Sequence, residues 1–132
     1  MLNPHGEDKG KDAAIKEEAH QLQSLMALNY SDYGSYCQLQ YGWISNTGMC
    51  AGAFNGTYAT NAQSICVNII NNQGTIGIYS NIGLATCDTA YSFMIYLNDG
   101  KVFCTGSSGM SAEYAMWGSP GDGTTPGCYN NP

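Results

Sequence analysis

The hydrophobic and polar positions near the start of the chain predict one long amphipathic helix. It is expected to begin at Lys11 or Asp12, with Asp12 as its N-cap, and to end before Gly34. Residues 1–10 are polar and are expected to form a flexible leader. Apolar side chains recur at spacings of three or four residues, which places them on one helical face. This stripe consists of Ile15, Ala19, Leu22, Met26 and Tyr30. A single apolar stripe indicates that the helix packs on another layer.

Downstream of the helix the pattern changes from a helical period to alternation. Residues 35–64 are rich in glycine and aromatic side chains and are expected to form a structured loop region. Apolar residues then alternate with other residues over 64–70, 75–79 and 91–97, which predicts three strands. The residues after Gly106 are irregular and are expected to form a C-terminal loop without strands.

The dipeptide Asp99-Gly100 predicts a tight hairpin after the third strand. A two-residue turn of this composition favours type I′, which places Leu97 opposite Val102. In this register one face carries Phe93, Ile95, Leu97, Val102 and Cys104, and the other carries Tyr96 and Phe103. The order of one helix followed by antiparallel strands predicts an α+β fold, with the helix packed on an antiparallel sheet.

The length and charge of the chain indicate a single domain and argue against nucleic acid and anionic membranes as partners. A chain of 132 residues suits one domain, and we expect residues 11–132 to form it. The formal net charge is −6, and the four basic residues are all lysines. Binding to nucleic acid requires many cations that displace counterions from phosphates, so we expect no strong nucleic-acid binding. An anionic membrane surface is disfavoured for the same reason.

The cysteines indicate an oxidising compartment. The chain has six of them, widely spaced and without a C-x-x-C pair, so a zinc site or a thioredoxin-like motif is not predicted. Disulfides in a small domain are typical of the periplasm, the cell surface and the extracellular space. The candidate disulfide residues are Cys37, Cys50, Cys66, Cys87, Cys104 and Cys128.

Two segments resemble the type IV pilins and pseudopilins of bacteria. In residues 11–36 an amphipathic helix with alanine and lysine runs into the ending Tyr30-x-x-x-Gly34-x-Tyr36. In residues 87–109 a strand ends in a cysteine and a Gly/Ser turn, as in several members of these families. The resemblance implies a pilin-like fold, in which a long N-terminal helix lies on an antiparallel sheet and a disulfide pins a C-terminal loop.

The resemblance also implies a role. Members are structural subunits of extracellular filaments at the cell surface, which serve adhesion, motility or uptake, or they are pseudopilins of type II secretion. Their partners are other subunits. An apolar first half of the helix holds the precursor in the inner membrane, and a leader peptidase cuts before it. The present sequence lacks that half, so the resemblance implies that it is the soluble domain of a longer subunit.

The disulfide pairing is expected from loop lengths together with the resemblance. A Cys37–Cys50 pair would close a short glycine-containing loop. Pilins often bound a C-terminal loop with cysteines, which implies that Cys128 pins the tail. With Cys104 as the partner of Cys128, these pairs leave Cys66 to pair with Cys87, one of 15 possible pairings of six cysteines. An alternative pairs Cys87 with Cys104. The predicted hairpin argues against it, because Cys104 lies opposite Ile95 and Cys87 eight residues earlier, but a bend in the chain would allow it.

Catalytic and metal chemistry have few candidate residues. The only histidines are His5, in the predicted leader, and His20, on the helix, so we expect no enzyme activity. We expect no cofactor. Asp122, in a Gly-Asp-Gly segment, is a weak calcium candidate. Calcium sites use several carboxylate oxygens, and Asp122 is the only acidic residue after Glu113.

Aromatic residues support a second hypothesis from another functional class. Trp43 and Trp117, together with ten tyrosines, could form a surface contact in a secreted module that binds carbohydrate or another surface. The ordinary role of these side chains, packing in the core and anchoring loops, is the competing interpretation. A small secreted hydrolase is the third and least supported hypothesis.

Overall fold

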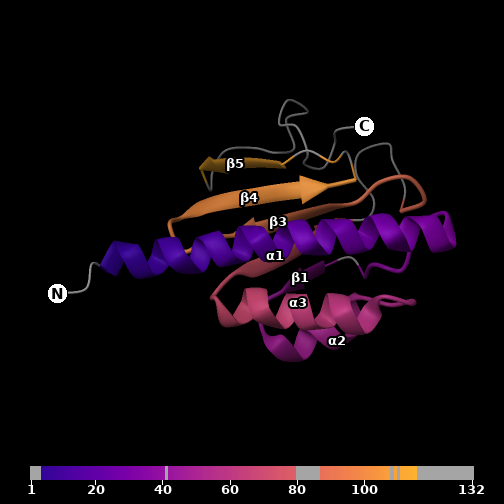
Figure 1. The fold of residues 1–132 in the computed structure, drawn as a ribbon, viewed down its shortest axis with the longest axis horizontal. Coiled ribbons are helices and arrows are strands. Elements are labelled where there is room, and N and C mark those ends of the chain that lie inside the picture. Colours follow the sequence, from indigo (N-terminus) through magenta and orange to yellow (C-terminus); the bar gives the residue numbers. More distant parts are fainter. Residues whose placement is uncertain (1–3, 41, 80–86, 108, 110, 116–132) are drawn as a thin grey trace.

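The computed structural model describes residues 4–40, 42–79, 87–107, 109 and 111–115 as three α-helices, a short 3-10 helix and five strands (Figure 1). The elements are α1 (Pro4–Tyr33), β1 (Gly42–Ile44), η1 (Thr47–Met49), α2 (Cys50–Ala53), α3 (Ala59–Asn71), β2 (Thr75–Tyr79), β3 (Ser92–Tyr96), β4 (Lys101–Gly106) and β5 (Ser111–Ala115). Within these residues no helix combines the length and apolarity that are needed to cross a membrane.

Helix α1 is longer than the sequence pattern predicts. It begins at Pro4, so the expected flexible leader is wrong for residues 4–10, which continue the helix. Proline is well tolerated in the first helical turn, where its missing N–H needs no intrahelical partner. Asp12 therefore lies inside the helix and is not its N-cap. The predicted end is confirmed, because Gly34 has a φ of 71° and its N–H donates to the Tyr30 carbonyl at 2.8 Å.

The five strands form one antiparallel sheet in the order β1-β2-β3-β4-β5. Helices α1 and α3 lie side by side and pack on the sheet, and this arrangement confirms the predicted α+β architecture (Figure 1). The main core contains Ile15, Ala19, Leu22 and Met26 from α1, each at most 1% exposed. The apolar stripe therefore lies between the helices and the sheet.

Tyr30 does not belong to the buried stripe, because its side chain is 41% exposed. At about 100° of rotation per residue, position 30 is turned about 60° away from position 15. Position 29 is turned by only about 40°, in the other direction, and Asn29 is the residue that the core buries. The prediction that Tyr30 ends the buried stripe is thus wrong, because helical rotation turns position 29 and not position 30 toward the core.

The predicted strand over residues 64–70 is wrong, because these residues belong to helix α3. The alternating Ile65, Val67 and Ile69 favoured a strand, but α3 buries a different set. Ala62, Cys66 and Ile69 are fully buried, at spacings of four and three residues. Burial at a helical period against α1 therefore overrides the local preference of β-branched residues for strands. The expected loop region of residues 35–64 accordingly holds β1, η1, α2 and the first turns of α3.

The β3–β4 hairpin has a register one residue away from the predicted one. Tyr96 pairs with Val102, Ile95 with Phe103, and Met94 with Cys104. The loop therefore contains three residues, 98–100, and Gly100 adopts a φ of 86°, as a three-residue hairpin with a bulge requires. A one-residue shift exchanges the faces of one strand.

The register change moves side chains between two clusters. Phe103 joins Phe93, Ile95 and Leu97 in the main core. Val102 and Cys104 join Met94 and Tyr96 in a second cluster, on the opposite side of the sheet. The predicted composition of the two faces is thus wrong for Val102, Cys104 and Phe103. A fifth strand, β5, follows, where the sequence pattern predicted only a loop.

A row of aromatic rings runs from the exposed end of α1 into the core. The ring of Tyr30 lies 4.8 Å from that of Tyr36, Tyr36 lies 4.7 Å from Tyr91, and Tyr91 lies 5.0 Å from Phe93, all between centroids. Tyr91 is only 3% exposed. Burial raises the pKa of its phenol far above the ordinary 10.0, and the neighbouring Tyr36 contributes in the same direction.

This pKa shift predicts a loss of stability at alkaline pH. Below pH 10 the Tyr91 phenol is neutral in both states, and its burial is fully stabilising. Above pH 10 only the unfolded chain ionises, so the free energy of unfolding falls by up to about 1.4 kcal/mol per pH unit. Urea unfolding from about pH 9 to 11 should show this slope in the wild type and a smaller one in Tyr91→Phe. Equal slopes would contradict the assignment to Tyr91.

Candidate functional site

Asp12 joins the first helix to the β3–β4 hairpin. One carboxylate oxygen, Oδ1, accepts hydrogen bonds from the Asn98 backbone N–H at 2.7 Å and from Asn98 Nδ2 at 2.9 Å. The other oxygen, Oδ2, accepts from the Asp99 backbone N–H at 3.1 Å. Asp12 is 5% exposed. A buried carboxylate that satisfies three donors fixes the position of the hairpin against α1.

The sequence contained a signal for this role. Asp12 lies three residues before Ile15, so it continues the buried stripe of α1 rather than the solvent face. A second link between α1 and the sheet is an ion pair between Lys16 Nζ and Glu113 Oε2, at 2.8 Å. Both side chains are about a third exposed, so this pair contributes little to stability.

The disulfides differ from the predicted pairing. Cys37 pairs with Cys87, and Cys50 pairs with Cys66. The predicted Cys37–Cys50 and Cys66–Cys87 pairs and the alternative Cys87–Cys104 are therefore wrong. The reason is that residue 66 lies on a helix that packs against α2, which brings the Cα atoms of Cys50 and Cys66 to 5.9 Å.

Cys104 also forms a disulfide. The other member of the predicted Cys104–Cys128 pair lies outside the described residues. The predictions for Trp117 and for Asp122 as a calcium ligand lie outside them as well. His20 is exposed on α1, and its ring lies at 77° to that of Phe103, with the centroids 5.6 Å apart.

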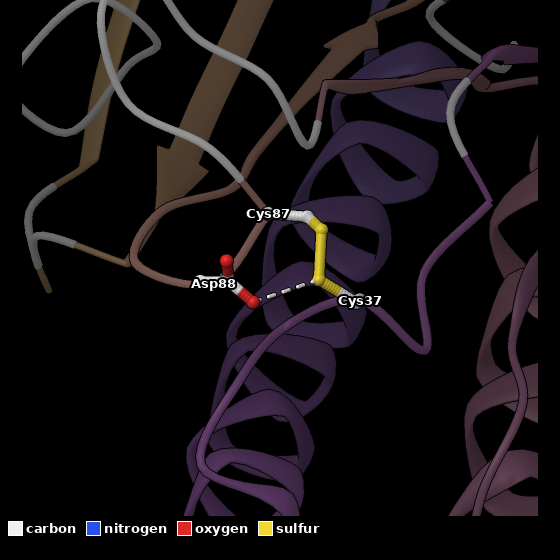
Figure 2. A group of neighbouring side chains, drawn as sticks. All are labelled: Cys37, Cys87 and Asp88. Atoms are coloured by element: carbon white, nitrogen blue, oxygen red, sulfur yellow. Dashed lines mark hydrogen bonds between the residues drawn. A yellow bond between two sulfur atoms is a disulfide. The ribbon is translucent and has the colours of Figure 1, made fainter.

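The Cys37–Cys87 disulfide lies at the surface beside a carboxylate (Figure 2). It links the segment after α1 to the segment that precedes β3. In addition, the Tyr36 N–H donates to the Cys87 carbonyl at 2.8 Å. Asp88 Oδ1 points at Cys37 Sγ, 3.5 Å away. A disulfide sulfur has no proton to donate, so this contact places negative charge directly in front of the more exposed sulfur.

Cys37, Cys87 and Asp88 are also the group of potential metal ligands in the described residues, with ligand atoms within 4.8 Å of one another. In the oxidised state neither sulfur is a thiolate, and thiolates are the form that binds metal. The arrangement in the structure is therefore a cross-link with a carboxylate beside one of its sulfurs.

This geometry predicts that Asp88 slows reduction of the disulfide by anionic thiols. Disulfide exchange proceeds by attack of a thiolate on a sulfur. A charge at about 4 Å in water is worth about 1 kcal/mol, so Asp88→Asn should accelerate reduction by glutathione roughly fivefold at low salt. Cysteamine, whose ammonium offsets the thiolate charge, should show little change. Alkylation followed by peptide mapping at Cys37 and Cys87 measures both rates, and equal acceleration by the two thiols would contradict the electrostatic explanation.

Trp43, on β1, forms an aromatic group with two tyrosines. It pairs with Gly77 across β1 and β2, and a Cβ at Gly77 would lie 2.8 Å from the indole. The indole centroid lies 5.1 Å from Tyr96 and 6.0 Å from Tyr79. Gly77 is therefore small because the tryptophan ring covers it. A lone glycine among the β-branched residues of a strand was the signal for such a close approach.

Comparison with protein families, with curated protein sequences and with solved structures finds no match to this chain.

Proposed function

We propose that this chain is the soluble domain of a non-enzymatic structural subunit of a type IV pilus or a related extracellular filament. The observation that carries the proposal is the length of α1 relative to the sheet. Its 30 residues span about 45 Å at 1.5 Å per residue, whereas the six residues of β4 span about 20 Å. The N-terminal turns of α1 extend past the strands (Figure 1).

The two parts of α1 have different surroundings. Burial of the stripe begins at Asp12 and Ile15, while Lys9 and Gly10 are exposed. The domain thus uses only the later turns of the helix for its own core. The projecting turns are available to continue into a helix that packs against other subunits. In the proposed filament such helices form the centre, and the disulfide-linked domain forms the outer surface.

The proposal includes expectations about the full-length protein. An apolar helical segment before Pro4 would hold the precursor in the inner membrane and would bundle with other subunits after assembly. The mature subunit would then lie at the cell surface, where disulfides persist. A pseudopilin of type II secretion would share this architecture, but its filament would be a short structure at the envelope and not a surface filament.

Immunogold microscopy of producing cells tests the proposal. Antibodies raised against the 132-residue domain should label sheared filaments, and mass spectrometry of the sheared fraction should contain its peptides. Antibody adsorbed with the purified domain is the control. Labelling of short structures at the envelope, without surface filaments, would favour the pseudopilin. Labelling of the medium alone, with no assembled structure, would contradict a filament role.

A further inference from the structure

The Cys37–Cys87 disulfide and Asp88 bring three potential metal ligands together at the surface (Figure 2). Their sulfur and carboxylate oxygen atoms lie within 4.8 Å of one another. Cys37 and Asp88 are exposed, so solvent and ions reach the group directly. The two cysteines are separated by 50 residues, so no close-pair motif in the sequence marks them as ligands.

The backbone around the two cysteines is held by contacts that do not involve the sulfur atoms. The Tyr36 N–H donates to the Cys87 carbonyl at 2.8 Å. The Cys37 N–H donates to Ser35 Oγ at 3.3 Å. The Cα atoms of Cys37 and Cys87 are 4.9 Å apart. We therefore expect cleavage of the S–S bond to leave two thiols side by side, next to the carboxylate.

We propose that Cys37, Cys87 and Asp88 form a zinc site when the disulfide is reduced. Two molecules of a thiol reductant supply two electrons and two protons, cleave the S–S bond and leave joined as one disulfide. Zinc then displaces the protons of the two cysteine thiols, which bind it as thiolates. The Asp88 carboxylate is the third ligand, and water takes the fourth position of the tetrahedron. The inference is independent of the proposed filament role.

The distances between the ligand atoms match tetrahedral zinc. With Zn–S bonds of about 2.3 Å and a Zn–O bond of about 2.0 Å, a sulfur and an oxygen ligand lie about 3.5 Å apart. Cys37 Sγ and Asp88 Oδ1 already have this separation, 3.5 Å. Two sulfur ligands lie about 3.8 Å apart, and rotation of the cysteine side chains provides this distance once the bond between them is broken.

The charge of the reduced group favours a divalent cation. Two thiolates and a carboxylate at close range repel one another, and a divalent ion among them replaces this repulsion with attraction. Magnesium and calcium prefer oxygen ligands, so the two sulfurs disfavour them. Thiolates also suit copper(I), but a carboxylate does not. Zinc accepts both kinds of ligand and is therefore the ion that the whole group fits.

Zinc titration of the reduced protein tests the proposal. The protein is reduced with a phosphine, freed of reductant in the absence of oxygen, and titrated in competition with a zinc-binding dye. We expect the reduced wild type to bind one equivalent of zinc, and the oxidised protein to show no comparable binding, because it offers no thiolate. Asp88→Asn should bind at least about tenfold more weakly, because it removes a ligand charge beside a divalent ion.

The matched control for Asp88→Asn is Glu17→Gln, which also removes one exposed carboxylate. Glu17 lies on α1 and does not belong to the group of ligands. This variant should bind zinc as tightly as the wild type. Equal affinities of Asp88→Asn and Glu17→Gln would overturn the assignment of Asp88 as a ligand, and with it the proposed site.

A double variant, Cys37→Ser/Cys87→Ser, separates the site from the other cysteines that complete reduction releases. It should lose the bound equivalent of zinc, and binding as tight as in the wild type would overturn the proposal. Failure of the folded, reduced wild type to bind zinc would also overturn it.

Limited reduction decides the question if complete reduction unfolds the protein. Cys50 and Cys66 are at most 1% exposed, so a small amount of reductant should cleave the Cys37–Cys87 bond first. Alkylation followed by peptide mapping then measures whether zinc protects the two released thiols. Protection that is lost in Asp88→Asn is the expected result, and alkylation at the same rate with and without zinc would overturn the proposal.

Discussion

Replacing Leu22 with alanine is expected to lower the free energy of unfolding by about 3 kcal/mol. Leu22 is fully buried and lies in the core between α1, α3 and the sheet. Removal of its three terminal carbons loses the transfer free energy of these groups and leaves a cavity. Neighbouring side chains such as Ile15 and Met26 are themselves fully buried, so the site has little freedom to collapse. Urea denaturation of the oxidised protein measures the difference.

The matched control for this prediction is Leu28→Ala. Leu28 lies on the same helix and is 47% exposed, so its truncation should change the free energy of unfolding by less than about 0.5 kcal/mol. Both substitutions alter helix propensity equally, and their difference isolates the contribution of burial. Equal stability of the two variants would contradict the packing of the apolar stripe of α1 on the sheet. It would also contradict the architecture on which the filament proposal depends.

Replacing Asp12 with alanine is expected to have the second large effect, also about 3 kcal/mol. The substitution leaves the backbone N–H groups of Asn98 and Asp99 and the Asn98 side-chain amide without their acceptor. Unpaired polar groups in a partly buried site cost more than the hydrogen bonds themselves contributed. Amide hydrogen exchange at residues 98 and 99 should accelerate together with the loss of stability.

Glu17→Ala provides the control for charge and helix position. Glu17 lies on the exposed side of α1, and its removal also deletes one negative charge. It should change the free energy of unfolding by less than about 0.5 kcal/mol. Asp12→Asn should fall between the two, because its amide keeps one acceptor oxygen but places a donor against donors. An Asp12→Ala protein as stable as Glu17→Ala would show that the hairpin is held by packing alone.

Local pattern determined the elements whose own residues dictate them. The stripe from Ile15 to Met26 has a helical period, and Gly34 provides the left-handed residue that ends the helix. Strand β2 matches the predicted 75–79, and β3 lies within the predicted 91–97. Each of these features depends on neighbours within about one turn or one strand, so it can be read along the chain.

Long-range contacts decided what the local pattern left ambiguous. Residues 64–70 carry alternating β-branched side chains, yet they form α3 because α1 offers a surface that fits a helical face. Asp99 and Gly100 would suit a two-residue turn, yet the Asp12 carboxylate binds Asn98 and Asp99 in a three-residue loop and the register moves by one. In both cases the free energy of a tertiary contact exceeds the local preference.

The candidate sites show the same division. Sequence pointed to Trp43 as a surface contact and to the cysteines as disulfides, because residue type carries that information. It could not pair the cysteines or place Asp88 in front of Cys37, since positions 37 and 87 are separated by 50 residues and are brought together only by the tertiary structure. The sequence by itself thus determined most of helix α1, strands β2 and β3, and the presence of disulfides. Register, pairing and the surroundings of each side chain were decided by tertiary packing, because they depend on distances that no local period encodes.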